Sequence, residues 1–73
     1  ILLTGANGLI GSYIAKLLAE NGKPFKCLIR PGADISLLSQ IQSKLNIAEG
    51  DILDVLSLEK ALEGVDTIIH CAA

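Results

Sequence analysis

The sequence has few of the residues and patterns that mark several classes of protein. It contains 73 residues, with no methionine or tryptophan, one histidine and two cysteines. Its six lysine and arginine residues are scattered and its formal net charge is −2, so we expect no nucleic acid partner. No apolar run approaches the roughly 18 residues of a membrane-spanning helix, and no signal-peptide pattern is present. We therefore expect no membrane partner and a cytoplasmic location.

The length and the two ends of the sequence favour a part of a larger domain. Hydrophobic residues make up 51% of the chain, which is enough for one small core near the lower limit of self-sufficiency. The chain has no initiating methionine, begins within an apolar run and ends directly after another. We therefore interpret residues 1–73 as the N-terminal part of a single domain, truncated at both ends.

Three glycines spaced three residues apart join the first apolar run to an amphipathic segment. The run covers residues 1–3, the glycines are Gly5, Gly8 and Gly11, and the amphipathic segment covers residues 9–21. This order predicts a strand, a turn and a helix. Gly5 would permit the tight turn, Gly8 would let the backbone approach a pyrophosphate, and Gly11 would let the helix pack closely on the strand.

The start of this helix is the expected phosphate site. The first N–H groups of a helix have no intrahelical partner and lie at the positive end of its dipole. The N–H groups of Leu9 and Ile10 would therefore donate to phosphate, and Asn7 tolerates a left-handed turn conformation. A glycine-rich turn without a ligand is the alternative interpretation. The helical spacing predicts a buried face of Ile10, Tyr13, Ile14, Leu17 and Leu18, opposite Ser12, Lys16 and Glu20.

The rest of the chain alternates strand and helix signals. Strands are predicted at residues 25–30, 45–48 and 67–72. A short helix is predicted from an Asp34 cap through residue 41, and another between an Asp54 cap and Gly64. With the first strand and helix, this β-α-β-α-β-α-β order predicts an α/β fold with a parallel sheet. Right-handed crossovers give the strand order 3-2-1-4, the first half of a doubly wound, Rossmann-type sheet.

The predicted topology keeps the two cysteines apart. Cys27 and Cys71 fall on strands separated by the first strand, at about twice the strand spacing of 4.8 Å. A disulfide needs Cα atoms within about 7 Å. We therefore expect buried, reduced thiols, as is usual in cytoplasmic proteins.

The residue at the end of the second strand predicts which dinucleotide binds. About 20 residues after the glycines, Rossmann domains that prefer NAD usually carry an acidic residue, whereas an arginine accommodates a 2′-phosphate. Arg30 occupies this place, so we expect NADP, with NAD as the alternative. A solvated arginine at a strand end is the competing interpretation, and Asp34 nearby is interpreted as a helix cap.

Four motifs together resemble the extended short-chain dehydrogenase/reductases. This family includes NAD(P)-dependent sugar-nucleotide epimerases, dehydratases and dihydroflavonol-reductase-like enzymes. The stretch from Thr4 to Gly11 is similar to its TGxxGxxG motif, and residues 66–73 are similar to its DxxxHxAA motif. The other two similar elements are Ile29-Arg30-Pro31, at the end of the second strand, and Gly50-Asp51-Ile52, after the third.

The resemblance implies further contacts with the cofactor. The Asp51 side chain and the Ile52 N–H would meet the adenine, although an aspartate after glycine often binds only nearby backbone. Ala72 and Ala73, at the end of the fourth strand, would leave room for the ribose. His70 is interpreted as a packed histidine without a chemical role. The expected cofactor-binding residues are Gly5, Asn7, Gly8, Leu9, Ile10, Gly11, Arg30, Asp51, Ile52, Ala72 and Ala73.

The catalytic residues of the resembled family are not found in this stretch. Its members use a Tyr-x-x-x-Lys pair beyond the fourth strand, whereas Tyr13 is followed four places later by Leu17. We expect the chain to be the NAD(P)-binding portion of an oxidoreductase or epimerase/dehydratase, inactive alone, with its small-molecule substrate bound by other regions. A homodimer is one assembly open to the parent protein. The alternatives are a non-catalytic NAD(P)-binding or redox-sensing domain, and a structural module whose fourth strand pairs through an open edge.

Overall fold

A computed structural model describes residues 1–71 and shows the predicted α/β architecture. The four strands form one parallel sheet in the order β3-β2-β1-β4, which confirms the predicted fold and strand order. The strands are β1 (Leu2–Thr4), β2 (Lys26–Ile29), β3 (Ile47–Glu49) and β4 (Ile68–His70). The helices are α1 (Leu9–Glu20), the 3₁₀ helix η1 (Ser36–Lys44) and α2 (Val55–Ala61).

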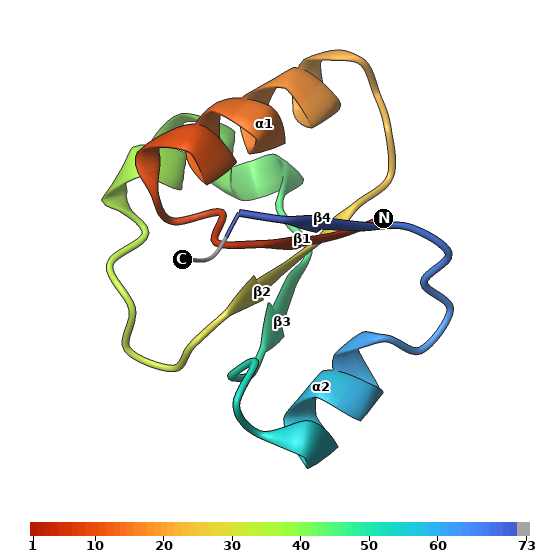
Figure 1. Cartoon of the computed structure of the whole chain (residues 1–73). Coiled ribbons are helices and arrows are strands. Elements are labelled where there is room, and N and C mark those ends of the chain that lie inside the picture. The colour runs from red at the N-terminus through yellow and green to blue at the C-terminus, as the bar shows by residue number, and fades with distance from the viewer. Residues whose placement is uncertain (72–73) are drawn as a thin grey trace.

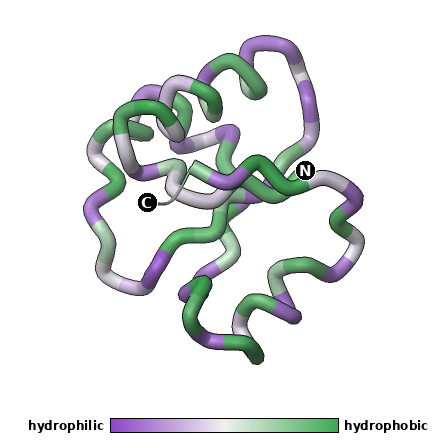
Figure 2. The backbone as a smooth tube through the Cα atoms, viewed as in Figure 1, coloured by the Kyte–Doolittle hydropathy of each residue, from purple (hydrophilic) through white to green (hydrophobic). Residues whose placement is uncertain are grey.

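The helices cover the sheet from both sides. Helices α1 and η1 lie on one face and α2 lies on the other (Figure 1). Because successive strand residues point to opposite faces, Leu3 and Cys27 pack toward α1 and η1, whereas Leu2 and Leu28 pack toward Ala61 of α2. The central strands are accordingly hydrophobic (Figure 2), as expected for a parallel sheet covered on both faces.

The buried face of α1 differs from the predicted one. Ile10 and Tyr13, predicted to be buried, are 72% and 64% exposed, and Leu17 is also exposed. Ser12, predicted to be exposed, is buried. Its hydroxyl donates to the Leu9 carbonyl at 3.0 Å, so burial leaves no unpaired donor.

Close packing of Gly11 explains this orientation of α1. A Cβ atom at Gly11 would overlap the Gly5 carbonyl and lie 2.9 Å from the Cα of Ala6. Only the glycine side of the helix therefore fits against the turn that precedes it. Ala15, one turn later on the same side, is fully buried. Steric fit at Gly11, which hydropathy does not register, sets the rotation of the helix.

Most predicted helix ends are present. Gly22 follows α1 with a φ of +65°, and its N–H and that of Lys23 donate to the carbonyls of Ala19 and Leu18, a Schellman-type ending. Asp54 caps α2 through its side chain. Gly64 takes a φ of +73° just beyond α2, whose C-cap residue is Leu62.

The segment after β2 differs from its prediction in detail. The predicted helix is a 3₁₀ helix whose N-cap residue is Ile35, so Asp34 is not its cap. The Asp34 carboxylate instead accepts the Ser36 N–H at 2.9 Å, and this bond lowers the pKa of that carboxyl. Strand β3 begins two residues later than predicted, and β4 is shorter than the predicted 67–72.

Both cysteines are free thiols, as predicted. Cys27 is fully buried, and burial raises the pKa of its thiol to about 11. Cys71 is only half-buried, because it follows the outermost strand β4. No helix within residues 1–71 is both long and apolar enough to cross a membrane.

Candidate functional site

The carboxyl ends of the four strands surround a cavity of about 540 Å³. In open α/β sheets, ligands bind outside these ends, where the strand order reverses. Here the reversal falls at β1, whose neighbours are β2 and β4. The cavity is lined by Thr4, Gly5, Asn7, Gly8, Leu28, Arg30, Ala33, Gly50, Asp51, Ile52, Leu53 and Cys71.

The turn between β1 and α1 forms one wall of this cavity. Gly5 has a φ of +71°, and the Gly8 N–H donates to its carbonyl at 3.1 Å. No residue other than glycine within 1–71 has a positive φ, so Asn7 does not adopt the left-handed conformation that it could tolerate. Gly5 supplies the left-handed step at lower steric cost. Asn7 is half-buried and lines the cavity.

The start of α1 offers unpaired N–H groups beside this wall. Its N-cap residue, Gly8, has no side chain that could accept these N–H groups, and its first turn contains no acidic residue. The first backbone bond of the helix joins the Ser12 N–H to the Gly8 carbonyl at 2.9 Å. Within the described chain, the N–H groups of Leu9 and Ile10 donate to no acceptor. A 12-residue helix with a bare N-terminus suits an anion.

The surface beside Gly8 is open. A Cβ atom there would meet only the Gly5 carbonyl, at 3.5 Å, which is an ordinary contact. The backbone conformation of Gly8, with φ −87° and ψ 176°, is one that any residue can adopt. Neither packing nor conformation within residues 1–71 therefore requires glycine at this position, and the open space beside Gly8 gives a ligand room to approach the backbone closely.

Arg30 enters the cavity from the end of β2. It is exposed, and no carboxylate within residues 1–71 forms an ion pair with it. Asp51 lines the same cavity from the loop after β3, which pairs with β2. A planar guanidinium with free donors is suited to bidentate binding of phosphate.

Asp51 makes the local backbone contact that was the alternative to adenine binding, and it keeps one carboxylate oxygen free. One carboxylate oxygen, Oδ1, accepts the Leu53 N–H at 3.0 Å, so the local backbone bond is present. The other oxygen makes no hydrogen bond within residues 1–71, and neither does the N–H of Ile52. A free acceptor and a free donor therefore lie on successive residues at the cavity wall.

His70 is exposed, which corrects its interpretation as a packed histidine. It is the register partner of Thr4 in the β1–β4 pair, and its Nδ1 lies 2.6 Å from the Thr4 hydroxyl. This side-chain bond joins two strands that are 66 residues apart in the sequence. His70 does not line the cavity.

The cavity unites several of the predicted residues and adds others. Gly5, Asn7, Gly8, Arg30, Asp51 and Ile52 all line it, whereas Leu9, Ile10 and Gly11 belong to the adjoining helix. Ala72 and Ala73 lie outside the described residues. The lining residues that were not among the predicted cofactor-binding residues are Thr4, Leu28, Ala33, Gly50, Leu53 and Cys71. The position of Cys71 at the carboxyl end of a predicted strand was the available signal.

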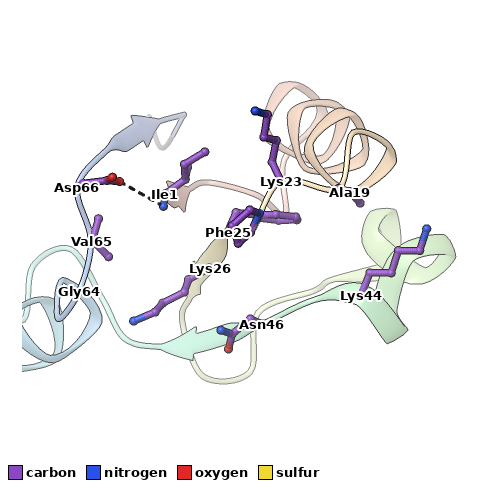
Figure 3. Close-up of a pocket in the computed structure, with 12 residues that line it drawn as sticks. Ile1, Ala19, Lys23, Phe25, Lys26, Lys44, Asn46, Gly64, Val65 and Asp66 are labelled. Atoms are coloured by element: carbon purple, nitrogen blue, oxygen red, sulfur yellow. Dashed lines mark ion pairs between the residues drawn. The ribbon is translucent and has the colours of Figure 1, made fainter.

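A second cavity, of about 680 Å³, lies at the opposite end of the sheet (Figure 3). Lys23, Lys26 and Lys44 line it, but their side chains point in different directions (Figure 3). The Lys26 ammonium donates to the Glu63 carbonyl at 3.0 Å. No set of groups converges on this space in the described chain, so the cavity at the carboxyl ends is the candidate site.

Comparison with known proteins identifies the family. The NAD dependent epimerase/dehydratase family matches the sequence over residues 1–73. The chain belongs to this family. Its cofactor class is therefore a nicotinamide dinucleotide, for which the strand-end cavity, the glycine-rich turn and the bare helix start provide a chemically suitable site.

Several relatives are similar across this chain. Cinnamoyl-CoA reductase 1 of Petunia hybrida is 31% identical over 78 residues, covering all of this chain and 23% of the relative. The crystal structure of gox2253 matches with a TM-score of 0.87 at 39% identity, covering 99% of this chain and 21% of that one. A leucoanthocyanidin reductase–NADPH complex from Vitis vinifera matches with a TM-score of 0.81 at 25% identity, covering 99% and 26%. The chain thus spans about a quarter or less of each relative's length.

Proposed function

We propose that residues 1–73 are the N-terminal, cofactor-binding part of a single Rossmann domain in an extended short-chain reductase, epimerase or dehydratase. The parent protein would transfer hydride at a carbonyl or hydroxyl carbon and would prefer NADP to NAD. The observation that carries this proposal is that Arg30 lines the same cavity as the glycine-rich turn and has no carboxylate partner among residues 1–71. The two free thiols support a cytoplasmic location.

The pyrophosphate of the cofactor would lie over Gly8. The N–H groups of Leu9 and Ile10 would donate to its oxygens, at the positive end of the α1 dipole. Asn7 would complete the wall on one side. Gly5 and Gly11 would act indirectly: Gly5 forms the turn, and Gly11 lets α1 pack closely against that turn.

The adenosine end would lie between the ends of β2 and β3. The Arg30 guanidinium would bind the 2′-phosphate. The free Asp51 oxygen would accept from the adenine 6-amino group while the Ile52 N–H donates to the adjacent ring nitrogen. Adenine presents a donor and an acceptor side by side, which matches this pair. Ala72 and Ala73 would leave space for the ribose, and the NADPH bound in the grape relative supports the cofactor assignment.

The residues of this chain would hold the cofactor and exclude water, without taking part in proton transfer. The nicotinamide ring supplies the hydride when it is bound. By resemblance to the extended short-chain family, we expect a tyrosine acid/base and its lysine partner in the parent protein beyond residue 73. Substrate recognition would come from the same later regions.

The test is a titration of the full-length protein with NADPH and with NADH, followed by turnover assays. Carbonyl compounds, hydroxycinnamoyl thioesters and sugar nucleotides form the substrate panel. NADPH binding at least about tenfold tighter than NADH binding supports the proposal, since one good charged hydrogen-bonding contact supplies that difference. Equal affinities would contradict the NADP assignment. Binding without turnover of any substrate would favour a non-catalytic NAD(P)-binding domain.

A further inference from the structure

Ser57 in the first turn of α2 is bonded to both backbone groups of Asp51. Its hydroxyl oxygen accepts the Asp51 N–H at 3.2 Å. The hydroxyl proton has two carbonyl acceptors within reach, that of Asp51 at 3.3 Å and that of Asp54 at 3.0 Å. The side chain of Ser57 is half-buried and does not line the cavity. Ser57 therefore contacts the backbone of Asp51, a cavity-lining residue, without lining the cavity itself.

Two other bonds complete a compact loop between β3 and α2. The Asp54 N–H donates to the Asp51 carbonyl at 2.9 Å, and the Leu53 N–H donates to the Asp51 carboxylate. With the Ser57 hydroxyl, these bonds fix the peptide groups on both sides of the Asp51 Cα. The free Asp51 oxygen and the free Ile52 N–H are thereby held in one relative orientation.

Close packing of Ser57 and Leu28 explains why residue 50 is a glycine. A Cβ atom at Gly50 would lie 3.0 Å from the Ser57 Cβ, the Ser57 hydroxyl oxygen and the Leu28 Cδ1. Gly50 is itself buried. Helix α2 therefore packs closely enough on this loop for the short side chain of Ser57 to reach the Asp51 backbone.

We propose that Ser57 is a positioning residue for adenine recognition. The proposal rests on the proposed function, since it assumes that Asp51 and Ile52 read the base. Ser57 would make no contact with the cofactor. It would hold Asp51 and Ile52 so that the acceptor and the donor match the adenine edge at the same time. Loss of the hydroxyl would leave the Asp51 N–H without its partner and release this orientation.

The experiment compares two cofactors that differ only at the base edge. Nicotinamide hypoxanthine dinucleotide phosphate replaces the 6-amino donor of NADPH with an oxygen acceptor and protonates the adjacent nitrogen. We expect the full-length protein to bind NADPH about tenfold more tightly than the reduced hypoxanthine analogue. The analogue would present an acceptor to the Asp51 oxygen and a donor to the Ile52 N–H, so neither group would be paired. In Ser57→Ala, this ratio falls to about threefold or less, whereas Ser57→Thr, which keeps the hydroxyl, retains most of it.

The ratio separates positioning from a merely structural role. If Ser57 only stabilises the loop, Ser57→Ala lowers the melting temperature and both affinities while the ratio stays at the wild-type value, and this result would overturn the proposal. A wild-type protein with no preference for adenine also overturns it. A wild-type protein that binds neither cofactor instead refutes the proposed function itself.

Two further variants complete the design. Ser39→Ala removes an exposed serine of η1, so it should leave the ratio unchanged. If Ser57→Ala does not fold, Ser57→Cys provides the decisive measurement, because a thiol is a poor hydrogen-bonding group of similar shape. A wild-type ratio in a folded Ser57→Cys protein would count against positioning by the hydroxyl.

Discussion

The three glycines of the first turn have three different physical roles. Gly5 has a left-handed conformation, and Gly11 is placed where a side chain would overlap the preceding turn. Gly8 has neither constraint, since its conformation is ordinary and the space beside it is open. Substitutions at Gly8 and Gly11 should therefore separate ligand binding from folding.

Gly11→Ala is expected to destabilise the fold. The new methyl group would overlap the Gly5 carbonyl, and overpacking of this kind costs about 1–3 kcal/mol of unfolding free energy. Urea denaturation of the full-length protein measures this loss. Gly8→Ser is the matched variant, since serine is a favoured N-cap. It should keep its unfolding midpoint and lose NADPH affinity, and the opposite pattern would contradict the proposed position of the pyrophosphate.

Arg30→Asp is expected to reverse the preference for the 2′-phosphate. The carboxylate would repel that phosphate and accept a hydrogen bond from an unmodified ribose. NADPH affinity should fall by about a hundredfold or more, equivalent to loss of roughly 3 kcal/mol, whereas NADH affinity should fall far less. Parallel titrations with the two cofactors measure this. Lys44→Asp, a charge change on η1 outside this cavity, is the control, and an unchanged preference in Arg30→Asp would assign phosphate recognition elsewhere.

Helices and strands could be placed from the sequence more reliably than they could be oriented. Glycine and aspartate signals gave the ends of α1 and the start of α2, because they report local backbone needs. The rotation of α1 was predicted wrongly from hydropathy, since the contact at Gly11 depends on a neighbouring turn. The helix predicted after β2 is a 3₁₀ helix in the structure. The spacing of apolar residues over so short a segment does not distinguish a 3₁₀ helix from an α-helix.

Removal of the Asp54 cap should weaken α2. Its carboxylate accepts the Leu56 N–H at 3.1 Å and the Ser57 N–H at 3.5 Å. Asp54→Ala should lower the unfolding free energy by about 1 kcal/mol, a typical value for loss of an N-cap. Asp54→Asn keeps an oxygen acceptor and should retain most of the stability. Chemical denaturation of both variants provides the measurement, and equal losses would show that the cap bond itself is unimportant.

The candidate site belongs to the assembled molecule and to none of its segments alone. Each wall follows a different strand, and the pairing of β1 with β2 and β4 brings the walls together. The strand order was predictable from the connections, so the neighbourhood of Gly8, Arg30 and Asp51 was predictable too. The free and occupied oxygens of Asp51 were not, because they depend on how the loop closes on α2.

The two thiols provide a direct probe of this assembled site. Cys71 lines the cavity and is half-buried, whereas Cys27 is fully buried and the pKa of its thiol is raised to about 11. Iodoacetamide should label Cys71 in the native protein and spare Cys27, since thiolates are the reactive species. Saturating NADPH should slow the labelling of Cys71. Peptide mass spectrometry measures both, and Cys71→Ser should remove the native signal.

Labelling of Cys27 before unfolding would contradict the burial described above. Labelling of Cys71 at the same rate with and without NADPH would place the cofactor outside this cavity. Addition of denaturant should expose both cysteines equally, which provides the reference rate for each thiol.

The pairing of β4 with β1 also sets an order of events during synthesis. Strand β1 can pair with β4 only late in synthesis, because His70, the partner of the Thr4 hydroxyl, is translated 66 residues later. A nascent chain that ends before residue 68 has the glycine-rich turn but lacks one of its flanking strands. The proposed cofactor site is therefore expected to form in a nascent chain only after β4 has left the ribosomal exit tunnel.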